Sequence, residues 1–392
     1  IADFDTQGVL IPSSVRPESG PYLADSMMVA STWGNFNNAF ADPNGKAALV
    51  DSITSAVTGV VIAKDGKTDV YLNGQRESVR TEETNLGSLT ADANLWQALQ
   101  YDPNVKVSIK NGGGIRAAIG EVREVAPGEY EFLPPQANPL SGKQDGEVSQ
   151  LDIENSLRFN NGLTVLDLSA AGLKDVLEHG VAAWAPSATP GQMCQVGGVE
   201  FSFDPAQAAG SRIQSMIIVD TAGNPTDTVV RNGALVGDTA RIIKVVTLDF
   251  LSGGGDNYPY PARASNYVDL DTVTAIGAGN STFAPKGTEQ DALAEYMLNR
   301  YTVNAYDMED QPVEKDRRIQ ILSLRADEIF GVEVAFKAGR IVLDETVGTA
   351  NVVIYYNNQT SSNQTIGWNA LNISTADGSD YSLSAAFGVA TA

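Results

Sequence analysis

The sequence predicts a mixed α/β fold in which helices and strands alternate along the chain. Several segments place apolar residues at helical spacing, and several short runs rich in Val and Ile are typical of strands. Two of these strands run directly into glycine triplets, at 112–114 and 253–255. Because a glycine run lets the backbone approach a ligand closely, we expect both junctions to lie at a binding site.

The first part of the chain shows little regular pattern. Up to about residue 40 it holds short strand-like pieces interrupted by Pro, Gly and Ser. Residues 45–57 place apolar side chains at roughly helical spacing, which predicts a connecting helix. Strands over 58–62 and 69–72 follow, with a turn expected at Asp65-Gly66 between them.

The clearest helix pattern begins near residue 84. Its apolar face carries Leu86, Leu89, Ala93, Trp96 and Leu99. Thr84 or Asn85 can cap its start, and Glu82 and Glu83 suit the positive end of the helix dipole. A strand over 105–109 then leads into the first glycine triplet.

The remainder continues the alternation of helices and strands. Helices are predicted over about 170–181 and 291–301, and strands over 199–203, 213–219 and 242–251, the last entering the second glycine triplet. After about Asp327 the composition shifts to Val, Ile, Thr, Asn and Ser with turn signals, which predicts a small β-rich appendage.

Composition restricts the possible partners. The 392 residues are 43% hydrophobic and 19% charged, enough for two or three globular domains. The net charge of −22 repels nucleic acids and anionic membrane surfaces, so a nucleic-acid polymer is not an expected partner. No run approaches 18 apolar residues, so no membrane span is expected. A small anionic ligand still fits if a few arginines converge locally.

The single cysteine and the start of the sequence are informative about the cellular compartment. The single cysteine, Cys194, cannot form an intrachain disulfide, and a buried role is expected for it. The chain begins at Ile1 without a leader pattern, so any signal peptide has been removed or was never included. Together with the acidic charge and the polar C-terminal region, this favours an exported bacterial protein, periplasmic or extracellular.

Familiar catalytic patterns are absent from the sequence. A two-metal phosphoesterase centre needs clustered His, Asp and Asn ligands, whereas the chain has one histidine, His179. We expect His179 to interact with the C-terminal end of the 170–181 helix rather than to act in catalysis. Neither a phosphate-binding loop of the Gly-x-x-x-x-Gly-Lys-Ser/Thr type nor a Gly-x-Ser-x-Gly elbow occurs.

Four ordered stretches instead resemble the C-terminal substrate-binding domain of the 5′-nucleotidase family, which includes UDP-sugar hydrolases. They are RESVR at 76–80 leading into ETNLGSLTAD at 83–92, NGGGIR at 111–116, LRFN at 157–160 and DFLSGGGD at 249–256. One glycine motif alone is weak evidence, whereas this ordered series is specific.

The resemblance implies a fold and a division of the chain. It implies a layered α-β-β-α domain with mixed sheets over 56–326, preceded at 1–55 by the tail of a metallophosphatase domain and a linker helix. Residues 327–392 would form the β-rich extension. In the family the N-terminal domain holds two divalent metal ions and carries out catalysis, so the resemblance implies no catalytic residue and no cofactor in this chain.

The resemblance also assigns a ring-stacking pair and the ribose contacts. Phe159 and Phe250 would stack on the two faces of a base, although two such residues taken alone could equally be core phenylalanines. Asp256 would accept hydrogen bonds from ribose hydroxyls, or stabilise its own turn. Asn111 would hydrogen-bond the base or the ribose.

Three arginines and the first glycine run complete the implied site. Arg76, Arg80 and Arg116 would meet phosphate or the rim of the pocket, although each alone could be a surface ion pair. Gly113 and Gly114, with Gly112, would allow the close backbone approach. The chain departs from the family at Arg158, where Pro is frequent, and at Asn257, where Gly is common.

Three functions are compatible with these residues. The chain could be the nucleoside- or nucleotide-binding domain of a 5′-nucleotidase-like phosphoester hydrolase. Alternatively, it could be a stand-alone nucleoside-binding module, or the binding domain of a hydrolase acting on a non-nucleotide phospho- or sulfo-ester. Both phenylalanines of the stacking pair are present, which favours a base as ligand. The sequence gives no indication of the oligomeric state.

Overall fold

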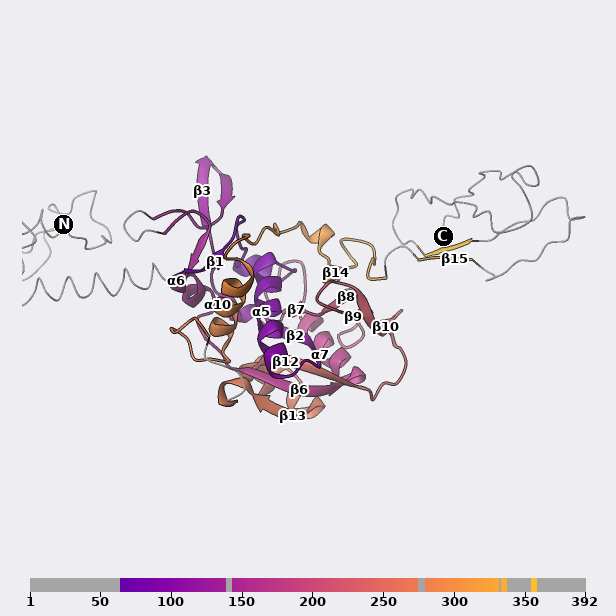
Figure 1. The fold of residues 1–392 in the computed structure, drawn as a ribbon. Coiled ribbons are helices and arrows are strands. Elements are labelled where there is room, and N and C mark those ends of the chain that lie inside the picture. The colour runs from indigo at the N-terminus through magenta and orange to yellow at the C-terminus, as the bar shows by residue number, and fades with distance from the viewer. Residues whose placement is uncertain (1–63, 139–142, 274–278, 331–332, 337–353, 358–392) are drawn as a thin grey trace, which may run out of the picture.

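The computed structural model describes residues 64–138, 143–273, 279–330, 333–336 and 354–357 (Figure 1). The predicted helix over 45–57, the strand over 58–62 and the whole of segment 1–55 lie outside the described residues, as does most of 327–392. The division of the chain at residues 55 and 326 therefore stays a prediction.

A five-stranded mixed sheet forms the centre of the fold. Its strand order is β13-β6-β12-β2-β7, and only β12 and β2 are parallel neighbours within it. The strands are β2 (Val105–Asn111), β6 (Leu163–Ser169), β7 (Cys194–Gly197), β12 (Ile242–Leu248) and β13 (Ala264–Asp269). Apolar residues of the inner strands are almost fully buried, as expected for a sheet covered on both faces.

A second five-stranded sheet has the order β11-β10-β9-β8-β14, in which β8 and β14 are parallel. Its strands are β8 (Val199–Phe203), β9 (Ile213–Val219), β10 (Pro225–Arg231), β11 (Ala234–Leu235) and β14 (Ile319–Ile321). One continuous apolar core joins this sheet to the central one and includes Phe201, Met216 and Val245.

Two of the three longer helices pack on the central sheet, and the third packs on one of them. The three helices are α5 (Asn85–Tyr101), α7 (Ala170–Ala182) and α10 (Glu289–Arg300). Helix α5 packs on β2 and β7, α10 packs against α5, and α7 contacts strands of both sheets. The shorter helices are α4 (Arg76–Val79), α6 (Gln150–Ser156), α8 (Asp249–Ser252) and α9 (Tyr260–Arg263), with 3-10 turns η2 (Gly112–Gly114), η3 (Gly255–Asn257), η4 (Leu270–Thr272) and η5 (Val313–Lys315).

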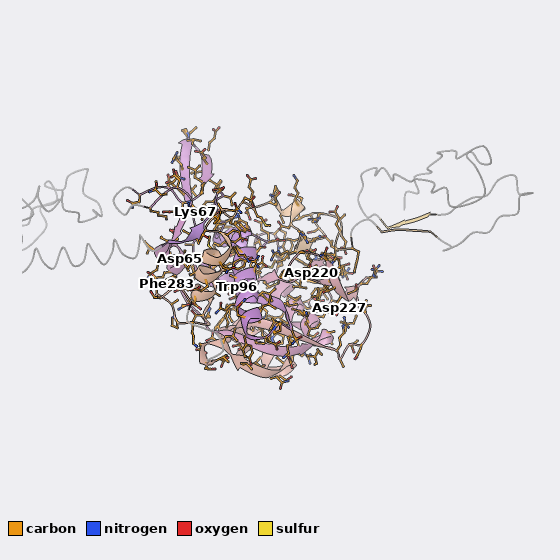
Figure 2. All side chains as sticks on the ribbon, viewed as in Figure 1. Asp65, Lys67, Trp96, Asp220, Asp227 and Phe283 are labelled. Carbon is orange, nitrogen blue, oxygen red and sulfur yellow. The ribbon has the colours of Figure 1, made fainter. Side chains whose placement is uncertain are left out.

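Small strand pairs lie outside the two main sheets. They are β1 (Lys64–Lys67) with β5 (Glu147–Ser149), β3 (Glu121–Ala126) with β4 (Glu129–Leu133), and β15 (Glu333–Phe336) with β16 (Ile354–Asn357). The β3–β4 hairpin projects from the body of the molecule above β1 (Figure 1). Asp65 and Lys67 on β1 lie at the end of the molecule opposite Asp220 and Asp227 (Figure 2).

The predicted fold class, mixed α/β with mixed sheets, is confirmed. Helices appear at all three predicted places within the described residues, and Thr84 caps α5 by accepting a hydrogen bond from the backbone N of Gly87. The strands predicted over 105–109, 199–203 and 213–219 are also present.

Three local predictions were wrong. Asp65-Gly66 does not form a turn but lies inside β1, where pairing with β5 shifts register and Gly66 adopts φ +110°. Of residues 69–72, only Leu72 pairs, in an isolated bridge with Ile119. The apolar run over 242–251 stops being a strand at Leu248, because the next residues begin α8.

Helix α5 is buried on more than the one apolar face that the sequence predicted. Leu86 and Leu89 are buried, and so are the polar residues Ser88, Asn94 and Gln97. The helix is enclosed because α10 covers the side that faces away from the sheet. In the described part of the chain, no helix combines the length and apolar character needed to cross a membrane.

Candidate functional site

The parallel pairing of β2 and β12 places their carboxyl ends at the same edge of the central sheet. Strand β2 ends at Asn111 and continues into η2, whereas β12 ends at Leu248 and continues through α8 into η3. Ligands of α/β proteins bind outside the carboxyl ends of strands at such positions. Both glycine triplets therefore meet at one edge of the sheet.

A hydrogen bond joins the two strand ends. The side-chain Nδ2 of Asn111 donates to Oδ2 of Asp256 over 2.6 Å. Asn111 is 4% exposed, and its Oδ1 is buried without a hydrogen-bond partner among the described residues. Oδ1 of Asp256 likewise accepts no hydrogen bond from the described residues. Since buried polar atoms in native proteins are almost always satisfied, the unpaired Oδ1 of Asn111 is a candidate contact for a ligand.

The loop that carries Asp256 is held in an unusual backbone conformation. Asp256 and Asn257 have φ of +50° and +61°, and Gly254 has φ +91°. Nε2 of His179 lies 2.8 Å from the carbonyl oxygen of Asp256 and donates to it. The expected place of His179 in the last turn of α7 is confirmed, and the hydrogen bond adds a role in fixing this loop.

The arginines form a positive group beside Asp256. Arg80 is 8% exposed, its Nη1 donates to the carbonyl oxygen of Thr189, and its Nε is buried without a partner in the described part of the chain. Burial lowers the pKa of Arg80 from its usual value, and the charges of Arg76 and Arg116 lower it further. The Asp256 carboxylate opposes this effect. The four charged groups therefore interact, although Arg76 and Arg116 are exposed.

The first glycine triplet packs against a segment that the sequence did not single out. The backbone N of Gly113 donates to the carbonyl oxygen of Gly191 over 2.9 Å. A Cβ on Gly191 would lie 3.6 Å from Oδ2 of Asp256 and 3.9 Å from Nη1 of Arg80. Gly191 is thus a site residue that was missed, because an isolated glycine between Pro190 and Gln192 carries no motif of its own.

Gly112 and Gly114 are glycines for different reasons. A Cβ on Gly112 would overlap the carbonyl oxygen of Val79, so the fold itself requires glycine there. A Cβ on Gly114 would lie 3.2 Å from Oδ1 of Asn111, the unpaired atom described above. Glycine at 114 therefore leaves space beside that atom.

The two phenylalanines are not core residues. Phe159 is 61% exposed and Phe250 is 46% exposed, which contradicts the alternative that they are a buried pair. The guanidinium of Arg116 lies 5.8 Å from the ring centre of Phe159. The ring of Phe250 lies over Gly255, where a Cβ would come within 2.6 Å of it. Each ring is thereby linked to the group around Arg80 and Asp256.

The remaining candidates are accounted for by packing. Cys194 is buried, and burial raises the pKa of its thiol to about 12, so a thiolate does not form at neutral pH. Arg158 is exposed, and its Nε donates to the carbonyl oxygen of Asn155. Among the residues that the structure describes, no three His, Cys, Asp or Glu side chains gather as metal ligands.

Comparison with known proteins identifies the family of the chain. A family model for the C-terminal domain of 5′-nucleotidases matches residues 61–263, more than half of the chain. The chain belongs to this family, and the resemblance stated from the motifs is confirmed.

Individual relatives carry related names. The trifunctional nucleotide phosphoesterase protein YfkN of Bacillus subtilis is 33% identical over 59% of this chain and 13% of its own length. A snake venom 5′-nucleotidase from Macrovipera lebetinus is 31% identical over 54% of this chain and 47% of its own length. The solved structure of a 5′-nucleotidase precursor from Thermus thermophilus aligns at 23% identity and a TM-score of 0.48, over 82% of this chain and 48% of that one. The chain thus spans less than half the length of each of these proteins.

Proposed function

We propose that the strand-end site binds a nucleoside or nucleotide and presents it to a separate catalytic domain of a phosphoester hydrolase. The observation that carries this proposal is one connected arrangement. The exposed rings of Phe159 and Phe250 lie near Arg116 and over Gly255. Asn111 and Asp256 form a half-satisfied pair, and the buried Arg80 interacts electrostatically with Asp256. Aromatic faces, unpaired acceptors and guanidinium groups match a base, a ribose and a phosphate in turn.

The rings of Phe159 and Phe250 would hold the base by stacking. Exposed aromatic rings contribute about 1–3 kcal/mol per stacked base. Gly255 supports this role because it allows the ring of Phe250 to lie against the backbone. Arg116, lying near the ring of Phe159, would restrict its orientation.

Asp256 and Asn111 would recognise the ribose or the base edge. Oδ1 of Asp256 is a charged acceptor suited to ribose hydroxyls, because hydrogen bonds to charged groups contribute about 1.5–3 kcal/mol. Oδ1 of Asn111 offers a second acceptor, whereas one of the two hydrogens on its Nδ2 is already donated to Asp256. The hydrogen bond between the two side chains orients both before a ligand arrives, which lowers the entropy cost of binding.

Arg76, Arg80 and Arg116 would attract the phosphate. Burial and, to a lesser extent, repulsion by Arg76 and Arg116 lower the pKa of Arg80, and this repulsion would be relieved when a dianion enters. This local positive potential also overcomes the net charge of −22 at contact distance. The positions of Gly113 and Gly114 bring backbone close to the same place.

We infer that bond cleavage takes place on a domain outside this chain, using two divalent metal ions that would supply charge stabilisation and an activated water. No set of metal ligands is found among the described residues, so no step is assigned to a metal here. The chain's own residues would bind and orient the substrate. A periplasmic or extracellular location of the full protein belongs to the same proposal.

Calorimetric titration with adenosine and AMP in metal-free buffer tests the proposal. We expect saturable binding and no phosphate release from AMP. Phe250→Ala should weaken binding at least about fivefold, because it removes one stacking face. Phe132→Ala is the matched control, since Phe132 is a similarly exposed ring on the β3–β4 hairpin. If no purine or pyrimidine nucleoside binds, or if Phe132→Ala has the same effect, the proposal fails.

A further inference from the structure

A cavity of about 380 Å³ lies beside the β3–β4 hairpin, apart from the nucleoside site. Its walls come from the segment before α4, from β4 and from residues 309–310, and the residues used below are Asp69, Tyr71, Asn73, Phe132, Glu309 and Asp310. It shares no residue with the strand-end site. Its volume is in the usual range for a small-molecule pocket.

Two aromatic rings form one wall. Leu72 is fully buried, whereas the neighbouring Tyr71 packs on Phe132 of the hairpin. The rings of Tyr71 and Phe132 meet edge to face, with centres 5.1 Å apart and planes at 61°. Gly120, with φ +141°, makes this possible, because a Cβ there would lie 2.6 Å from Cδ2 of Tyr71.

The lining of the cavity is also acidic. Oδ1 of Asp310 accepts a hydrogen bond from the backbone N of Asn85 over 2.8 Å, and Oδ2 accepts one from Nδ2 of Asn73 over 2.7 Å. Both donors are neutral groups, and burial raises the pKa of Asp310. Within the described ranges, no lysine or arginine lines the cavity or forms an ion pair with Asp69, Glu309 or Asp310.

We propose that this cavity binds an organic cation, either a free alkylammonium compound or the ammonium group of a lysine side chain. Aromatic faces attract such cations, most strongly when they are desolvated, and carboxylates lacking a cationic partner supply charge-assisted hydrogen bonds. The protein's net charge of −22 raises the local concentration of cations. The same charges repel nucleotides, so the two sites discriminate by the sign of the ligand's charge.

Titration calorimetry with three probes tests the assignment. The probes are 1,4-diaminobutane, N-acetyl-lysine methylamide and, as a neutral isostere, N-acetyl-norleucine methylamide. We expect saturable binding of the first two and none of the third. Preference for the diamine would indicate a free amine, and preference for the lysine derivative a side chain. Absence of binding by either ammonium probe, or equal binding of the norleucine probe, overturns the proposal.

Substitutions in the cavity lining test whether the ammonium compounds bind there. Glu309→Gln and Tyr71→Leu should each weaken ammonium binding about fivefold or more, because each removes one element of cation recognition. Asp271→Asn removes an exposed carboxylate that follows β13 and should change nothing. An equal loss with Asp271→Asn would show only general charge attraction and would overturn the assignment.

The two sites can be separated in one experiment. Phe132→Ala should lose ammonium binding and keep adenosine binding, whereas Phe250→Ala should show the reverse pattern. Because the proposal does not rest on nucleoside binding, failure at one site leaves the result at the other unaffected. Ammonium binding that survives Phe132→Ala, Tyr71→Leu and Glu309→Gln together would place the ligand elsewhere.

Discussion

Buried polar groups beside the two five-stranded sheets differ in how completely they are hydrogen-bonded. In the second sheet, Asp327 accepts hydrogen bonds from the hydroxyls of Ser202 on β8 and Ser215 on β9, both over 2.7 Å. At the edge of the central sheet, Asn111 and Arg80 each retain a buried atom without a partner among the described residues. The first arrangement is complete among the described residues, whereas the second leaves an acceptor and a donor available to the ligand proposed above. Unpaired buried atoms also occur at residues outside the candidate site, such as Asp65, so binding has to be measured beside stability.

Replacing Gly112 tests how far the site depends on the backbone. Gly112→Ala should lower the free energy of unfolding by about 3 kcal/mol, because its Cβ overlaps the carbonyl oxygen of Val79. Gly114→Ala should lower it by only about 1 kcal/mol but should abolish adenosine binding, since the methyl group enters the space beside Asn111. Urea unfolding and calorimetry give both values. A fully stable Gly112→Ala variant would contradict the packing described.

Exchanging one acid in each region tests the comparison directly. Asp256→Asn should weaken adenosine binding at least tenfold with little change in stability, because it removes a charged acceptor from an incompletely paired group. Asp327→Asn should lower the free energy of unfolding by about 1–2 kcal/mol and leave adenosine affinity unchanged. If both variants lose only stability, the hydrogen-bonded pair of Asn111 and Asp256 has a structural role and does not bind the ligand.

Asp65 also has an unpaired buried atom but is not a residue of the candidate site. It therefore tests whether lack of a partner by itself affects ligand binding. Its Oδ2 is buried without a partner among described residues, and burial, with the charges of Glu295 and Asp152, raises its pKa to about 6. The folded state thus keeps a proton that the unfolded state loses near pH 4, so this group favours folding at low pH and loses that contribution as pH rises through 6. Asp65→Asn should therefore gain up to about 3 kcal/mol of stability at pH 7 and little at pH 4.

Urea unfolding at the two pH values measures this difference, and adenosine titration of the same variant should show unchanged affinity. A loss of affinity would mean that lack of a partner does not by itself distinguish the two kinds of group. An equal gain in stability at pH 4 and pH 7 would contradict the raised pKa.

The smallest effect concerns His179. His179→Leu removes the donor to the carbonyl oxygen of Asp256 and should weaken adenosine binding about fivefold, because the loop loses one restraint. His179→Gln, which offers an amide donor, should restore affinity to within about twofold of the original. If the glutamine variant is as weak as the leucine variant, the hydrogen bond does not position Asp256.

The sequence predicted elements whose pattern is local. The α5 helix and the β2 and β12 strands have clear apolar periods, and their motifs led to Asn111 and Asp256. The pairing that makes Asp65-Gly66 a bulge involves Glu147 and Ser149, more than eighty residues away, so no local pattern could show it. The contact of Gly191 with Gly113 is invisible for the same reason.

Burial was the other quantity that the sequence could not supply. From the sequence, Phe159 and Phe250 could be either core residues or exposed rings, and only their exposure in the structure distinguishes the two. The β3–β4 hairpin was missed because its charged and apolar residues are largely exposed, so no buried face imposes a period. A buried ion pair, Lys110 with Glu289, likewise joins distant segments without a sequence signal.

The chain contains a single histidine, and its ring is bonded to the backbone of the loop that carries Asp256. Its imidazole protons therefore give one uncrowded set of signals in a proton magnetic resonance spectrum, without isotope labelling or an attached probe. The chemical shift of that set would follow movement of the Asp256 loop as a ligand arrives. The protein thus carries its own spectroscopic reporter beside the candidate site.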